Sequence, residues 1–166
     1  MRGSRLGGLI TGAVIVSSPV LITSAASIPE LFAQQVARAP EAVAVSCDGR
    51  SMSYRELDEA SDRLADFLVG RGVGPGERVA LLFPRSAEAI VSVVAVLKAG
   101  AAYLPIDPMH PDARIQFMLA DAEPVLAVTT AELAGRFADC DLDVIDFDDA
   151  CRGTQQGAGL PTPSAD

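Results

Sequence analysis

The side chains of this 166-residue chain that could do chemistry are few and scattered. Cys47, Cys140 and Cys151 are widely spaced and form no Cys-x-x-Cys pair, so free thiols in a reducing compartment are the simplest interpretation. The single histidine, His110, stands between two prolines and is predicted to be a turn residue rather than a catalytic base. One histidine cannot supply a multi-histidine metal site.

Acidic residues gather towards the C-terminal end of the sequence. Six aspartates fall within eleven residues: Asp139, Asp141, Asp143, Asp146, Asp148 and Asp149. No EF-hand spacing accompanies them, so a solvated strand with its flanking loop is favoured over a metal site. The formal charge of −9 offers no clustered basic surface, which argues against a nucleic-acid partner.

A glycine-rich segment, Gly70–Gly76, could suggest a phosphate-binding loop. A dinucleotide-binding loop leaves a strand and enters a helix, whereas this segment follows a predicted helix and precedes a predicted strand. A helix end followed by a tight turn explains the glycines better. The phosphate-loop motif Gly-x-x-x-x-Gly-Lys-Ser/Thr, Gly-x-Ser-x-Gly and His-Glu-x-x-His are all missing from the sequence. We therefore predict no catalytic, cofactor-binding or metal-binding residue in this chain.

The elements that carry these side chains alternate between helices and strands over residues 28–150. Helices are expected at about 27–39, 53–69, 86–99, 111–121 and 131–137, and strands at 42–46, 50–52, 78–83, 101–106, 125–128 and 142–145. Several strands are continuous apolar runs, as in sheets buried on both faces. The alternation predicts an α/β fold with a mostly parallel sheet.

The helix that follows Ser53 has the clearest amphipathic pattern. Its inward face is predicted to carry Leu57, Ser61, Leu64, Ala65 and Leu68. The carboxylates Asp58, Glu59 and Asp62 fall on its polar side and are interpreted as solvent contacts.

The two ends differ from this patterned region. Residues 1–27 combine early arginines, an apolar stretch and small residues, which imitates a secretory signal peptide. The stretch is shorter than the roughly 20 residues of a bilayer span, so no membrane span is expected. We favour an irrelevant leader or linker over an export signal, and hence a cytoplasmic location. Residues 151–166, rich in Gly, Gln, Pro and Ser, are predicted to be disordered.

Two segments carry a family resemblance. Met52–Leu57 (Met-Ser-Tyr-Arg-Glu-Leu) and Leu97–Pro108 (Leu-Lys-Ala-Gly-Ala-Ala-Tyr-Leu-Pro-Ile-Asp-Pro) resemble the first two core motifs of nonribosomal peptide synthetase adenylation domains, within the AMP-binding, adenylate-forming superfamily. The resemblance continues through Pro40–Val45, Gly72–Val79 and Pro111–Ile115. The departures from the usual motifs are mild: Met52, Ser53, Leu104 and His110.

The resemblance implies that residues 28–150 are the N-terminal part of an adenylate-forming large domain. A complete member binds ATP with magnesium and an amino acid, forms an aminoacyl adenylate and passes the acyl group to a carrier-domain phosphopantetheine thiol. The family's phosphate-binding loop and catalytic lysine have no matching positions here, so no catalytic residue is carried over and the chain alone is expected to be inactive. Lys98 is interpreted as a charge favourable to its helix dipole rather than a phosphate ligand.

The partial match also predicts incomplete packing, in which the strands around Leu81 and Leu104 lack neighbours and leave an apolar edge. Two alternatives stay open. The chain could be a noncatalytic remnant or interaction module, exported or membrane-associated through residues 1–27, or the start of a related acyl-CoA ligase. The Ala-Tyr-Leu-Pro-Ile-Asp-Pro run favours the synthetase branch.

Overall fold

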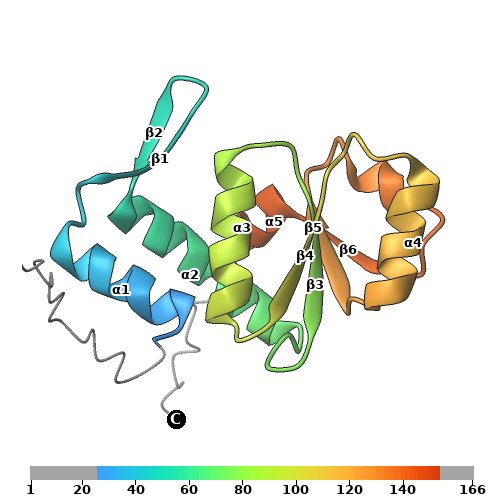
Figure 1. Ribbon diagram of the computed structural model, residues 1–166, viewed down its shortest axis with the longest axis horizontal. Helices are drawn as coiled ribbons and strands as arrows, with labels where there is room; N and C mark the ends of the chain where they lie inside the picture. The colour runs from blue at the N-terminus through green and yellow to red at the C-terminus, as the bar shows by residue number, and fades with distance from the viewer. Residues whose placement is uncertain (1–25, 154–166) are drawn as a thin grey trace, which may run out of the picture.

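The computed structural model describes residues 26–153 and contains a four-stranded parallel sheet with helices on both faces (Figure 1). The strand order is β4-β3-β5-β6, with bounds β3 Arg78–Leu82, β4 Ala102–Ile106, β5 Leu126–Thr129 and β6 Asp143–Asp146. An antiparallel hairpin of β1 (Val43–Cys47) and β2 (Arg50–Ser53) projects away from the sheet. The predicted α/β class and mostly parallel sheet are confirmed.

The helices are α1 Ile28–Arg38, α2 Tyr54–Gly70, α3 Ala87–Lys98, α4 Asp112–Ala122 and α5 Phe147–Gly153, with a short 3-10 helix η1 at Ala134–Phe137. Two of them, α1 and α2, begin with capping boxes. The backbone N–H of Ser53 donates to Glu56 Oε2 at 2.7 Å, and the Glu56 N–H donates to Ser53 Oγ at 3.2 Å. The same reciprocal pair joins Ser27 and Glu30 at the start of α1.

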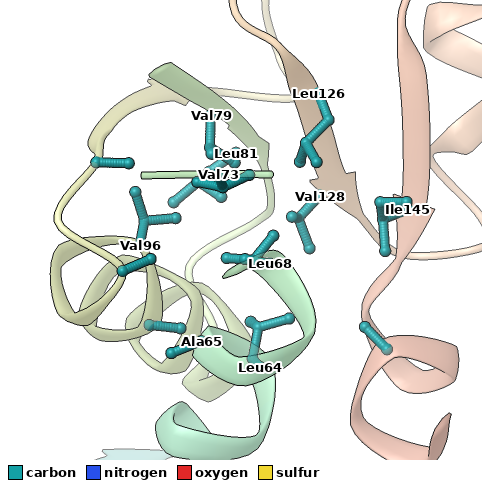
Figure 2. Close-up of a cluster of buried hydrophobic side chains, with 14 of the residues drawn as sticks. Leu64, Ala65, Leu68, Val73, Val79, Leu81, Val96, Leu126, Val128 and Ile145 are labelled. Carbon is teal, nitrogen blue, oxygen red and sulfur yellow. The ribbon is translucent and has the colours of Figure 1, made fainter. Parts of the chain in front are cut away.

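Alternate side chains of the strands serve two separate cores, because successive residues of a strand point to opposite faces of the sheet. On one face, α2, α3 and α5 cover Val79, Leu81, Leu126, Val128 and Ile145 (Figure 2). On the other, α4 and η1 cover Ala80, Leu82 and Ala127. The five inward residues predicted for α2 are the five that the structure buries.

The sequence predicts that the strands around Leu81 and Leu104 both lack neighbours; this prediction is wrong for the first strand and confirmed for the second. The strand around Leu81 has neighbours on both sides, since β3 pairs with β4 and with β5. The parallel crossover through α4 returns the chain to the far side of β3 and supplies the neighbour that was thought missing. The strand around Leu104, β4, is an edge: within residues 26–153 it pairs only with β3.

The C-terminal part of the described chain differs most from the sequence expectation. The predicted helix over 131–137 is reduced to η1, and residues Phe147–Gly153 form α5 instead of a loop and the start of a tail. Asp146 explains the extra helix, because its carboxylate accepts a hydrogen bond from the Asp149 N–H at 3.1 Å, as an N-cap does. The remainder of the predicted disordered tail, and nearly all of the leader 1–27, lie outside the described residues. No helix within residues 26–153 is long and apolar enough to cross a membrane.

Candidate functional site

A hollow with a mostly apolar lining lies where the hairpin approaches the carboxyl ends of β3 and β4. We call it the hairpin groove; its volume is about 570 Å³. Its lining includes Val45 and Cys47 from β1, Phe83 after β3, Ile90 on α3, and Pro105 and Ile106 of β4. Arg85, Asp107 and His110 add one cation, one anion and an imidazole. Ligands of open α/β sheets commonly bind at the carboxyl ends of strands, so this is the first place to look for one.

Local sequence sets the walls of the hairpin groove. Asp48 and Gly49 both adopt positive φ, at 49° and 75°, which is the turn conformation that Asp-Gly supports in a two-residue hairpin. After β3, the side chain of Ser86 caps α3 by accepting from the Ala89 N–H at 3.3 Å. The helix start expected at about residue 86 is therefore confirmed.

The loop that follows β4 is held by an arginine from η1. The guanidinium of Arg136 donates to Asp112 Oδ1 at 2.7 Å, to the Pro108 carbonyl at 2.8 Å and to the His110 carbonyl at 2.7 Å. The His110 N–H also donates to the Asp107 carbonyl at 3.0 Å, so His110 is the turn residue that the sequence predicts. Sequence reasoning missed Arg136, because its partners lie more than twenty residues away.

Lys98 is engaged by two helices rather than free for a ligand. Its ammonium donates to Asp58 Oδ1 at 2.7 Å and to Asp62 Oδ1 at 2.6 Å, and it lies 5.3 Å from the Phe32 ring centroid. The side chain keeps only 16% of its exposure. The interpretation of Asp58, Glu59 and Asp62 as solvent contacts holds for Glu59, which is exposed, and for Asp62, whose side chain is 59% exposed. It missed the ion pairs with Lys98, because the α2–α3 packing brings Asp58 and Asp62 against the last turn of α3.

The three cysteines are poor nucleophiles in this structure. Burial raises the pKa of the Cys47 thiol, and the adjacent Asp48 carboxylate raises it further. Burial also raises the pKa of Cys140, with a smaller effect from Asp139. For Cys151, burial outweighs the opposing charge of Arg63. Because the thiolate is the reactive form, these thiols stay largely protonated near neutral pH.

Two sequence features that could suggest a nucleotide or metal site take structural roles in the described residues. Gly70–Gly76 leaves α2 and enters β3, and Gly72 and Gly76 adopt φ of 87° and 92°, as a turn after a helix requires. Nowhere in residues 26–153 do three or more His, Cys, Asp or Glu side chains come together as a metal site would need. Aspartates of the 139–149 run instead cap a helix or form ion pairs. Asp146 caps α5, and Arg71 Nη1 lies 2.9 Å from Asp143 Oδ2.

Comparison with known proteins places this fold in a family. A family model described as AMP-binding enzyme matches residues 32–160, which is most of the chain. The chain belongs to the AMP-binding enzyme family. The resemblance drawn from the two core-motif segments is confirmed.

This AMP-binding family member is similar to nonribosomal peptide synthetases. It is 60% identical over 139 residues to the isonitrile lipopeptide synthase of Mycobacterium tuberculosis, covering 84% of this chain and 6% of that protein. A structure of the synthetase FmoA3 with α-methyl-L-serine-AMP shares 32% identity over 75% of this chain and 14% of that one, with a TM-score of 0.67. An artificially fused adenylation-PCP di-domain, NpsA-ThdA from Klebsiella oxytoca, shares 25% identity over 81% of this chain and 25% of that one, with a TM-score of 0.72. The chain therefore spans only a small part of the proteins it matches, and what it matches is part of an adenylation domain.

Within the AMP-binding fold, the two core-motif segments serve as scaffold. Met52–Leu57 closes the hairpin and opens α2 through its capping box. Leu97–Pro108 ends α3, turns at Gly100 with φ of 79°, and forms β4. A Cβ on Gly100 would lie 3.3 Å from Pro75 Cγ, so the glycine permits close packing of two loops.

Proposed function

We propose that this chain contributes the N-terminal part of an amino-acid-activating adenylation domain in nonribosomal peptide synthesis. The complete domain would join an amino acid to ATP as an aminoacyl adenylate, release pyrophosphate, and transfer the acyl group to a carrier-protein phosphopantetheine thiol. The observation that carries this proposal is the 60% identity to a lipopeptide synthase over a stretch that includes both core-motif segments. Relatives named as peptide synthetases favour this branch over an acyl-CoA ligase.

We further propose that these 166 residues do not adenylate an amino acid on their own. Lys98, the single cation of the second core-motif segment, is neutralised by Asp58 and Asp62, and the described carboxylates form no magnesium site. ATP and magnesium would be held by residues of the complete domain that this chain does not supply. Because the proposed reaction consumes ATP, we also propose a cytoplasmic location for the protein.

ATP–pyrophosphate exchange tests both statements. The purified chain is assayed against the twenty amino acids, alone and mixed with a complementing fragment, which is the rest of the adenylation domain that contains the matched stretch in the Mycobacterium tuberculosis synthase. We expect no exchange by either part alone and amino-acid-dependent exchange by the mixture. Exchange by the chain alone would contradict its role as scaffold.

A further inference from the structure

The loop between β4 and α4, residues 107–111, is held from outside by a single guanidinium. Arg136 spends a different nitrogen on each of its three acceptors: Nε on the Asp112 carboxylate, Nη1 on the Pro108 carbonyl and Nη2 on the His110 carbonyl. Its side chain is only 27% exposed, so water has limited access to these donors. A planar guanidinium holds several acceptors in one fixed arrangement, which a lysine ammonium does not. Arg136 therefore fixes the shape of the β4–α4 loop.

Bonds within the loop make a turn but do not tie it to the rest of the fold. The Met109 N–H donates to Asp107 Oδ1 at 2.8 Å, and the His110 N–H donates to the Asp107 carbonyl at 3.0 Å. The helix that follows, α4, begins after Pro111 without a side-chain cap. Arg136 is thus the side chain that connects this turn to η1.

The β4–α4 loop lies at the end of the sheet where ligands of open α/β folds bind. The four strands are parallel, so all of them end at the same edge. The order β4-β3-β5-β6 reverses direction between β3 and β5, and α3 covers one face of the sheet while α4 and η1 cover the other. Ligands bind outside the carboxyl ends of the strands at such a topological switch point.

A hollow of about 690 Å³ lies at that switch point, and the β4–α4 loop forms part of its wall. Pro84 and Ser86 line it after β3, Thr130 lines it after β5, and Pro108 lines it from the loop. On the other side of the loop, Asp107 and His110 line the hairpin groove. Arg136 lines neither hollow. It supports the loop from behind and does not reach a ligand in either place.

Building on the proposed function, we propose that Arg136 is a positioning residue for amino-acid activation. It touches no reactant, and it holds the β4–α4 loop in the shape that the assembled site requires. A misplacement of about 1 Å can lower the rate of an enzyme by about 10²-fold. Loss of the guanidinium should therefore lower the rate of adenylation in molecules that remain folded.

Three substitutions in the full chain separate positioning from stability. Arg136→Met keeps the apolar stem and removes all three donors, whereas Arg136→Lys keeps the charge beside Asp112 but cannot hold both loop carbonyls. Arg71→Met is the matched control. Arg71 also forms an arginine–aspartate pair, but its partner Asp143 is the first residue of β6, at the opposite end of the sheet.

Each variant is mixed with saturating complementing fragment, and the maximal rate of ATP–pyrophosphate exchange is measured where circular dichroism shows the chain to be folded. We expect this rate to fall about tenfold or more for Arg136→Met, because the loop loses its support. Arg136→Lys should recover stability through the Asp112 ion pair but leave the exchange rate about threefold or more below that of the parent. Arg71→Met should change the rate by less than about twofold.

Amide hydrogen exchange of the same chains without the fragment reports on the loop itself. The amides of Met109 and His110 should exchange about tenfold or more faster in Arg136→Met, since both are protected by the turn that Arg136 supports. The amide of Val128, in the core of β5, should be unchanged.

Two results would overturn the positioning role: unchanged amide exchange at Met109 and His110, or an ATP–pyrophosphate exchange rate that falls only in proportion to the unfolded fraction. Recovery of the full rate by Arg136→Lys would show that charge alone matters and would overturn it as well. If the unsubstituted mixture shows no ATP–pyrophosphate exchange, the proposed function fails and the role of Arg136 in the reaction falls with it. Amide exchange then still decides whether Arg136 fixes the loop.

Discussion

The ammonium of Lys98 lies 2.7 Å from Asp58 Oδ1, and this contact joins the end of α3 to the middle of α2. Asp62 and the ring of Phe32 complete the arrangement, so one lysine connects three helices. The lysine of the second core-motif segment is therefore a structural residue in this part of the domain.

Lys98→Met tests that role. The substitution keeps the apolar stem but leaves the Asp58 and Asp62 carboxylates without their cation, and we expect a loss of about 1–2 kcal/mol in the free energy of unfolding. Arg55→Met is the control, because its ion pair with Glu41 is well exposed and should be worth less than about 0.5 kcal/mol. Urea unfolding measures both. Equal effects would contradict a special role for Lys98.

Leu68→Ala tests the core between α2 and the sheet. Leu68 is fully buried, and its loss leaves a cavity that costs about 2–5 kcal/mol. That is a large share of the stability of a domain this small. Leu31→Ala, at a side chain 54% exposed, should change stability by less than about 0.5 kcal/mol. Thermal unfolding compares the stabilities of the two variants. A loss at Leu68→Ala as small as that at Leu31→Ala would show that α2 is not packed against the sheet as described.

The inward face of α2 could be predicted because a helical period of 3.6 residues is a local property. The Lys98 contacts could not, since they depend on how α2 and α3 lie against each other across forty residues of sequence. Helix α5 was missed because a run of aspartates suggests solvent, although Asp146 provides a cap and Ala150 is buried. The hairpin groove joins a turn, a helix start and a strand end, and no single segment of sequence reveals it.

Gly100→Ala tests the turn that links α3 to β4. The positive φ of Gly100 and the nearby Pro75 ring make any side chain unfavourable, so we expect a loss of about 1–3 kcal/mol. Gly74→Ala is the matched control, because open space surrounds that position and its φ is not positive. It should stay within about 1 kcal/mol of the parent. Similar unfolding midpoints for both variants would argue against this turn geometry.

The capping glutamates predict a dependence of stability on pH. The hydrogen bond from the Ser53 backbone N–H lowers the pKa of Glu56 below its ordinary 4.5, and the Ser27 N–H does the same for Glu30. Because the folded pKa is below the unfolded one, this stabilisation is complete above pH 4.5 and is lost as pH falls through the folded pKa. The stability gap between the parent chain and Glu56→Gln should therefore shrink below pH 4.5. A gap that widens on acidification would contradict the assignment.

The most direct test of whether residues 28–150 are part of an adenylation domain is to graft them into a related one. Residues 28–150 of this chain replace the matched stretch of the Mycobacterium tuberculosis adenylation domain, and ATP–pyrophosphate exchange is measured with the amino acid that the parent domain activates. If these residues are adenylation scaffold, the grafted domain keeps exchange within about tenfold of its parent, because each 1.4 kcal/mol of lost stabilisation corresponds to a factor of ten. A folded graft that binds its amino acid and ATP but catalyses no exchange would contradict the account.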